Sequence, residues 1–406
     1  MDRFVDLLDP ADHTVPGFVA GAAASGIRYQ GRPDLTLLLS EVPAVAAGVF
    51  TSNRVKAAPV VLSSEHLQRG ACRAIVANSG IANACTGEEG LQRARTVARA
   101  SAEAIGCQAE EVLLASTGVI GAQLPLTPIL QALPGLVADC RPDGWHDAAA
   151  AIMTTDTAEK LHCLRGNLGG TSFNLLGIAK GAGMIAPQMA TMLAFVATDA
   201  AVAPEALQTM LSAETRRSFN RITIDGDMST NDTVLVLANG LASNRTIHRA
   251  DSDDGRIFQE ALGHTLAILA RKILRDAEGG TKCVEIKLTS AATREQALRG
   301  ARTVAESLLV KTALFGQDPN WGRIMAALGR AAIDFVPERV TLHFDAVKVV
   351  ENGVLVSEEQ EKAAAEVMQR AEYLITIDLQ QGEARESVFT CDLSLDYVRI
   401  NADYRS

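Results

Sequence analysis

The sequence has no long apolar run and no dense basic segment. None of its apolar stretches approaches the roughly 20 residues that a membrane-spanning helix requires. The 406-residue chain has a formal net charge of −10, which repels a phosphate backbone, and its lysines and arginines form no stripe with interleaved aromatics. Neither a membrane nor a nucleic acid is therefore an expected partner.

Cysteine pairs are also missing. The seven cysteines are scattered without a Cys-x-x-Cys pair, and their odd number argues against a full disulfide framework. The first residues reach Asp9 and Asp12 before any long apolar run, so no secretory signal is expected. These features predict a soluble protein of the reducing cytoplasm.

Metal-binding signatures are absent as well. The seven histidines are isolated in the sequence, with no His-Glu-x-x-His or comparable spacing. Asp225, Asp227 and Asp232 lack the spacing of a calcium loop, and we interpret them as structural polar contacts. The sequence by itself predicts no metal site.

What is present fits a folded α/β protein. Apolar residues make up 48% of the chain and aromatics only 4%, so small residues dominate the expected core. Short apolar segments typical of strands alternate along the chain with segments whose apolar residues have helical spacing. This order is typical of α/β or α+β proteins. A domain boundary is expected near residue 285. Strands are expected at 35–39, 48–50, 60–62, 74–77, 171–179, 194–197, 233–238 and 373–379; helices at 90–105, 147–153, 204–217, 257–277 and 358–371; a loop at 124–145; and a closing apolar run at 397–400.

Residues 177–195 form the most unusual segment. Three glycines and a proline within it predict a tight, irregular backbone between two apolar strands. A structural turn is one interpretation. A phosphate-binding loop is disfavoured, because neither the Walker nor the dinucleotide-binding glycine pattern is present.

The same segment carries a specific resemblance. Lys180-Gly-Ala-Gly-Met-Ile-Ala-Pro-Gln-Met-Ala-Thr-Met-Leu is similar to the autoprocessing segment of the bifunctional ornithine acetyltransferase/glutamate N-acetyltransferase family of arginine biosynthesis. Further family-like motifs follow one another along the whole chain, at 49–60, 78–87, 116–121, 152–157, 225–232, 277–282, 318–323 and 401–406.

The resemblance implies self-cleavage between Ala190 and Thr191, which makes Thr191 both a new N-terminus and the acetyl-carrying nucleophile. A threonine hydroxyl is a weak nucleophile and requires a nearby base. The new α-amine has a reference pKa of about 7.7–8.0, so its neutral form can serve as that base. Cleavage thus creates the catalyst without a histidine.

The resemblance also implies the remaining site residues. Thr117 and Gly118 are expected to form the oxyanion hole, in which donors stabilise the charge that develops on the attacked carbonyl. The implied substrate contacts combine a cation and polar donors for a carboxylate with an anion for an ammonium group. They are Thr154, Lys180, Thr191, Glu278, Asn401 and Ser406.

The implied fold is a layered α/β sandwich akin to self-processing aminopeptidases and amidases. Its main domain spans residues 1–285, and a smaller α/β domain spans 286–406. Fragments 1–190 and 191–406 would assemble as α2β2. The implied substrates are N2-acetyl-L-ornithine and L-glutamate, the products ornithine and N-acetylglutamate, with no cofactor. The resemblance leaves open whether acetyl-CoA also serves as a donor.

Two other functions remain open from the sequence. An N-terminal-nucleophile amidase or aminopeptidase would use the same nucleophile with water as acceptor, so binding of a second amino acid by Lys180, Glu278 and Asn401 separates the two activities. A non-enzymatic binding protein would never expose Thr191 as an N-terminus. One full-length band on a denaturing gel would indicate that protein, and two bands the enzyme.

Overall fold

The computed structural model describes residues 3–186 and 192–403. The predicted cleavage pair, Ala190 and Thr191, and the predicted substrate contact Ser406 lie outside these ranges. The described residues divide into two compact units. The first comprises 3–184, 192–220 and 227–273, and the second comprises 185–186, 221–226 and 274–403.

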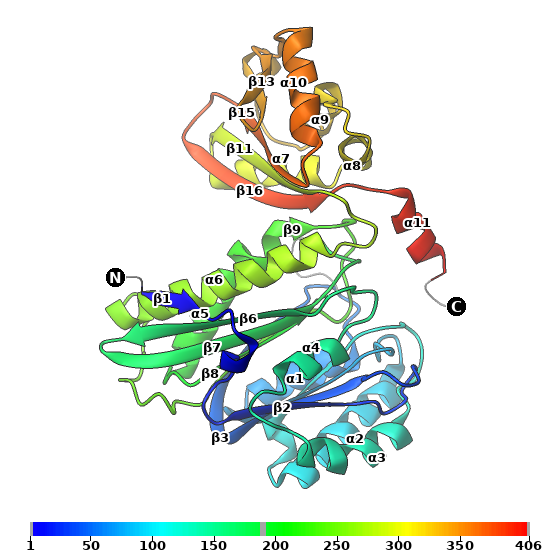
Figure 1. Cartoon of the computed structure of the whole chain (residues 1–406), viewed down its shortest axis with the longest axis vertical. Coiled ribbons are helices and arrows are strands. Elements are labelled where there is room, and N and C mark those ends of the chain that lie inside the picture. The colour runs from blue at the N-terminus through cyan, green and yellow to red at the C-terminus, as the bar shows by residue number, and fades with distance from the viewer. Residues whose placement is uncertain (1–2, 187–191, 404–406) are drawn as a thin grey trace. The chain divides into compact units, whose positions relative to one another are not determined.

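The first unit is built on a mixed sheet, which has nine strands within the described ranges (Figure 1). The order is β1-β6-β7-β8-β10-β3-β4-β5, and β2 also pairs with β3. Strands β8 and β10 are parallel, with Leu193 opposite Thr233. The strands are β1 (Phe4–Asp6), β2 (Phe18–Ala23), β3 (Leu35–Phe50), β4 (Ala71–Asn78), β5 (Val112–Ser116), β6 (Lys160–Leu168), β7 (Thr171–Lys180), β8 (Leu193–Thr198) and β10 (Thr233–Ala238).

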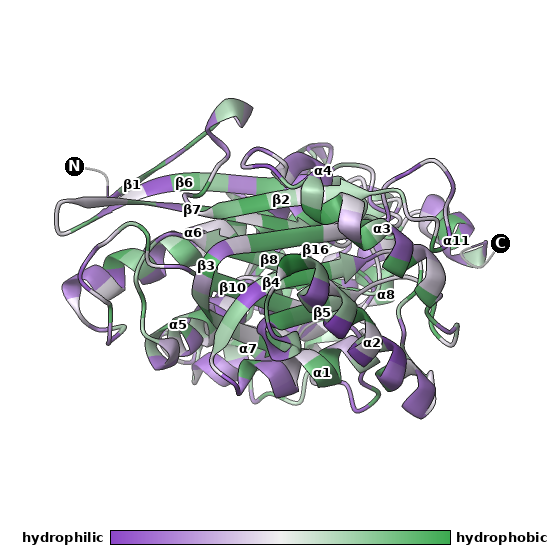
Figure 2. Cartoon of the chain, turned by 90° about the horizontal axis from the view of Figure 1, so that it is seen from below, coloured by the Kyte–Doolittle hydropathy of each residue, from purple (hydrophilic) through white to green (hydrophobic). Residues whose placement is uncertain are grey.

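Helices pack against this sheet and form an apolar core with it. The fully buried Trp145 and its helix neighbours share one apolar core with alternate residues of β6, β7 and β8 and with residues of β2–β5. The central strands are mostly hydrophobic in Figure 2, whereas the second helix carries many hydrophilic residues. The helices are α1 (Ala58–Leu67), α2 (Gly87–Ile105), α3 (Leu126–Ala138), α4 (Trp145–Ala151), α5 (Pro204–Arg217) and α6 (Asp253–Arg275), with short 3-10 turns at Pro10–Asp12, Ala109–Glu111 and Phe219–Arg221.

The long helix α6 packs directly against strand β7. A Cβ atom added at Gly177 would lie 2.9 Å from Leu269 and 3.1 Å from Thr265 of α6. The missing side chain therefore allows the helix to approach the sheet closely. No helix within the described ranges has both the length and the apolar character needed to cross a membrane.

The second unit has its own seven-stranded sheet and core, again counting described residues (Figure 1). The order is β14-β13-β12-β15-β11-β16-β9. Its strands are β9 (Ile222–Thr223), β11 (Cys283–Ala291), β12 (Thr341–Phe344), β13 (Val347–Glu351), β14 (Val354–Leu355), β15 (Glu372–Asp378) and β16 (Ala384–Cys391); its helices are α7 (Arg294–Ala305), α8 (Leu308–Phe315), α9 (Trp321–Gly329), α10 (Glu358–Met368) and α11 (Leu395–Ala402), with a 3-10 turn at Pro337–Arg339.

The predicted α/β class is confirmed, and most predicted elements are present. Strand β10 and helix α5 have the predicted bounds. The two strands predicted at 35–39 and 48–50 are one strand, β3, whose pairing with β4 is irregular between Leu39 and Ala44. That irregularity accommodates Pro43, which cannot donate a ladder hydrogen bond.

Two predicted elements differ from the observed ones, and a third segment gains a defined structure. Residues 60–62 were expected to form a strand but lie in α1, where Pro59 occupies the first turn; three apolar residues do not distinguish a strand from a helix. The predicted loop at 124–145 contains α3, because buried Ile129, Leu133 and Leu136 recur at helical spacing despite its prolines. The closing apolar run at 397–400 is part of α11.

Candidate active site

Strand β7 delivers a buried lysine to the end of the sheet in the first unit. Lys180 is the last residue of the strand and is 2% exposed. Its Nζ donates to Thr154 Oγ1 at 2.9 Å and to Thr117 Oγ1 at 3.3 Å. Three residues predicted from the sequence to act at one site are therefore in direct contact.

Asp156 balances the charge of this cluster. Its Oδ1 accepts hydrogen bonds from Lys160 Nζ at 2.7 Å and from the Gly181 amide at 2.6 Å, while its Oδ2 lies 3.7 Å from Lys180 Nζ. Burial by itself would raise the pKa of Asp156, but Lys180, Lys160 and the hydrogen bonds outweigh it and hold that pKa well below its usual range. Two lysines facing one ionised aspartate give the trio a net charge of +1.

A glycine turn follows strand β5 beside this cluster. The Thr117 amide donates to the Asn78 carbonyl at 2.9 Å, and Gly118 has a φ of +129°. A Cβ atom at Gly118 would lie 2.2 Å from the backbone carbon of Gly80. Only glycine fits this close approach.

Gly118→Ala is expected to lower the free energy of unfolding by about 3 kcal/mol or more, because it adds a backbone clash to an unfavourable φ. Urea unfolding measures the change. Gly121→Ala is the matched control, since Gly121 has a φ of +89° but nothing within 4 Å of an added Cβ. Equal losses in the two variants would contradict the role of the close approach.

A buried aspartate holds the backbone amide of Met192. Asp232 is 0% exposed, and its Oδ1 accepts the amide of Met192 at 3.0 Å. Met192 directly follows Thr191 in the sequence. Burial raises the pKa of Asp232 well above its usual value, partly offset by the hydrogen bond from Met192.

The second unit contains a separate polar pair. Glu278 is 8% exposed, although the position after a long helix is commonly solvated. Asn401 Nδ2, on α11, donates to Glu278 Oε2 at 2.7 Å. The next residue, Gly279, has a φ of +65°, and an added Cβ there would lie 2.6 Å from the Tyr397 amide nitrogen. This close packing of α11 brings Asn401 to Glu278.

The predicted site residues therefore form two groups that can be described. Thr117, Gly118, Thr154 and Lys180 lie in the first unit, and Glu278 and Asn401 lie in the second. Sequence reasoning omitted Asp156 and Lys160 as site residues. Asp156 stands within the family-like motif 152–157, so the motif itself carried the signal.

The chain is similar to known proteins over nearly its whole length. The sequence model of the ArgJ family matches residues 19–406. The arginine biosynthesis bifunctional protein ArgJ of Geobacter sulfurreducens is 48% identical over 392 residues, covering 97% of this chain and 100% of that protein. The protein of the same name from Chlorobaculum tepidum is 46% identical over 403 residues, covering 98% of each chain.

A solved structure is similar over a shorter span. Ornithine acetyltransferase from Mycobacterium tuberculosis, solved in complex with ornithine, is 36% identical to this chain. The match covers 47% of this chain and 99% of that one, with a TM-score of 0.42. Because the family model and the full-length relatives both extend over nearly the entire sequence, the chain belongs to the ArgJ family.

Proposed function

We propose that this protein is an acetyltransferase of arginine biosynthesis that moves an acetyl group from N2-acetyl-L-ornithine to L-glutamate. Its family membership and the name of its full-length relatives support this role. The single structural observation that carries the proposal is the buried contact of Lys180 with Thr117 and Thr154. None of the seven cysteines, all within the described residues, forms a disulfide, which is consistent with a cytoplasmic enzyme.

The reaction begins with self-cleavage. The Thr191 hydroxyl attacks the Ala190 carbonyl, the peptide C–N bond breaks, and water opens the resulting ester. The products are a carboxylate on Ala190 and a free α-amine on Thr191. The α-amine is then the base for every later step.

Acetyl transfer follows in two half-reactions. The Thr191 hydroxyl attacks the acetyl carbonyl and gives its proton to the α-amine, which passes it to the departing amine of ornithine. The acetyl group remains on Thr191 as an ester. The glutamate amine then attacks that ester, the Thr191 oxygen regains a proton, and N-acetylglutamate leaves. Thr117 and Gly118 stabilise the oxyanion in both half-reactions.

The charges of each of the two residue groups suit these substrates. Both amino acids carry an α-carboxylate, and the net positive charge of Lys180, Lys160 and Asp156 favours binding of an anion. In the second unit, Glu278 is an anion for the side-chain ammonium of ornithine, and Asn401 holds its carboxylate in position. A carboxylate has acceptor sites beyond the one that Asn401 uses.

The proposal extends to assembly and to a second donor. The cleaved fragments remain associated as α2β2, and acetyl-CoA serves as an additional acetyl donor. No organic cofactor takes part in transfer to glutamate. A hydrolytic amidase would instead pass the acyl group to water, so the acceptor of the acetyl group separates the two activities.

Intact mass spectrometry tests the proposal. A fragment beginning at Thr191 is expected to gain one acetyl group on incubation with N-acetylornithine alone and to lose it when glutamate is added. Loss of the acetyl group at the same rate without glutamate would indicate the hydrolase. An uncleaved, unmodified chain would overturn the acetyltransferase proposal.

Thr117→Val is expected to lower kcat about 100-fold, because it removes one hydroxyl donor while retaining a side chain of similar shape. The KM for N-acetylornithine should change much less. Steady-state kinetics measures both parameters. The control is Thr96→Val on α2, a half-buried position where the hydroxyl donates to the Gln92 carbonyl of its own helix. An unchanged kcat in Thr117→Val would remove this hydroxyl from the oxyanion hole.

A further inference from the structure

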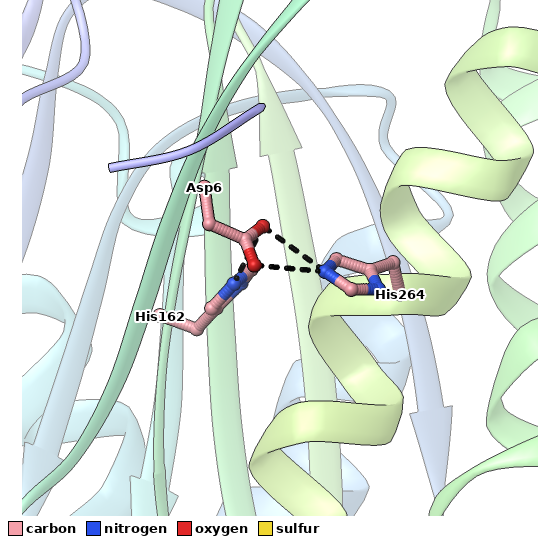
Figure 3. A group of neighbouring side chains, drawn as sticks. All are labelled: Asp6, His162 and His264. Carbon is pink, nitrogen blue, oxygen red and sulfur yellow. Dashed lines mark hydrogen bonds and ion pairs between the residues drawn. The ribbon is translucent and has the colours of Figure 1, made fainter. Parts of the chain in front are cut away.

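Three potential metal ligands from distant parts of the sequence meet in the first unit. Asp6 ends strand β1, His162 lies on strand β6, and His264 lies on helix α6. Figure 3 shows the Asp6 carboxylate between the two imidazole rings. One ligand atom from each residue lies within 4.8 Å of the others. The histidines predicted from the sequence to be isolated are therefore brought together by the fold.

The distances suit a shared cation. His162 Nε2 lies 3.2 Å from Asp6 Oδ1, and His264 Nε2 lies 3.0 Å from the same oxygen. Bonds of about 2.0–2.1 Å place neighbouring ligands of a tetrahedral ion about 3.3–3.4 Å apart. The carboxylate–imidazole spacings are thus close to those of a coordination shell, and small side-chain rotations complete it.

His162 provides independent support for a ligand. Its side chain is only 9% exposed, and its Nε2 faces Asp6 Oδ1 at 3.2 Å, a contact that is an ion pair only when the ring is protonated. Within the described residues this buried nitrogen has no other hydrogen-bond partner. A buried polar atom that lacks a partner is costly and calls for an explanation. A metal ion bound by the lone pair of this nitrogen supplies one.

The other ring nitrogen of His162 is already held. His162 Nδ1 lies 3.0 Å from the buried hydroxyl of Thr265 on α6. When Nδ1–H donates to that oxygen, Nε2 is left with its lone pair facing Asp6. Metal-binding histidines commonly use such a second contact to fix the ring.

We propose that Asp6, His162 and His264 bind one divalent transition-metal ion, with Zn²⁺ as the best match to two imidazoles and a carboxylate. Such a ligand set leaves a fourth position for water. Asp6 and His264 each have side chains that are 37% exposed, which provides a path for the ion from solvent. Binding of the ion at this cluster does not depend on acetyl transfer.

The bound ion would cross-link β1, β6 and α6. The exposed ion pair between Arg3 and Glu260 at 2.8 Å already joins the β1 region to α6, and surface pairs of this kind contribute little stability. Cleavage before Thr191 would leave Asp6 and His162 on one fragment and His264 on the other. The ion would then be coordinated by both fragments.

Zinc binding by the full chain tests the proposal directly. Protein purified without a polyhistidine tag and stripped with a chelator is titrated with Zn²⁺ by calorimetry, and bound metal is counted after dialysis. The expected stoichiometry is about one Zn²⁺ per chain. His264→Ala is expected to weaken binding at least about tenfold. Co²⁺ should give visible absorption bands of a tetrahedral site in the original protein and lose them in the variant.

His248→Ala is the matched control, because His248 is exposed and lies outside the cluster. It should bind Zn²⁺ as the original protein does. Asp6→Asn provides a second test that conserves shape and should also weaken binding, so misfolding of one variant leaves the other informative. Absence of Zn²⁺ binding by the original protein, or an affinity in His264→Ala and Asp6→Asn as high as that of the original protein, would overturn the proposal and leave Asp6 as a hydrogen-bond partner of His264.

Discussion

Thr191→Ala is expected to yield a single uncleaved 406-residue polypeptide without transferase activity. The substitution removes the hydroxyl that attacks the Ala190 carbonyl, and without cleavage the α-amine base is never released. Loss of a covalent nucleophile typically costs a factor of at least about 10⁴ in kcat. A denaturing gel and intact mass measure cleavage, and transfer from N-acetylornithine to glutamate measures activity.

Thr191→Ser is the matched control for this experiment. Serine retains the hydroxyl and the α-amine, so cleavage and acetyl transfer should both persist at a reduced rate. Urea unfolding of all three proteins separates a chemical effect from a folding defect. Two fragments in Thr191→Ala, or transferase activity in that variant, would refute Thr191 as the nucleophile.

Lys180→Met is expected to have the second largest effect, a loss of about 10³-fold in kcat/KM. The change removes a buried charge that contacts Thr154 and Thr117 and lies near Asp156. The lost interactions are charge-assisted hydrogen bonds and an ion pair. They are stronger in the protein interior than they would be in water. Kinetics with N-acetylornithine and glutamate as separate variable substrates measure the loss in each half-reaction.

Lys160→Met controls for the loss of a buried lysine. Lys160 is 1% exposed and donates to the same carboxylate, Asp156, at 2.7 Å. Both variants should lose stability, because each leaves Asp156 with one fewer cation. The kinetic loss should be much larger in Lys180→Met, whose lysine contacts both threonines. Equal kinetic losses would indicate that both lysines act only by stabilising the fold.

Both variants are expected to shift the pH dependence of stability in the same direction. The paired lysines hold the pKa of Asp156 below its ordinary value, so the stability this pairing contributes is present above the ordinary pKa and is lost as pH falls through the lowered one. Removing either lysine shifts that loss toward higher pH. The acid unfolding midpoint of either variant should therefore rise relative to that of the original protein.

Local pattern accounts for what the sequence predicted well. Strand β10 and helix α5 have the expected bounds because a short continuous apolar run and a proline in the first helical turn are visible within a few residues. The errors at α1 and α3 arose where prolines and short apolar runs were compatible with several structures. The motifs by themselves were sufficient to identify the family. They also identified Lys180, Thr117 and Thr154 as candidate site residues.

The tertiary structure alone decided which side chains meet. Asp6, His162 and His264 join through the pairing of β1 with β6 and the packing of α6, and no spacing in the sequence encodes that contact. The burial of Asp156 between two lysines and of Glu278 beside Asn401 arises in the same way. Residue type determines which chemistry a side chain can perform, but burial and long-range contacts determine its charge and its partners. The sequence by itself thus determined the family and the candidate nucleophile, whereas the folded chain determined the electrostatic balance around them.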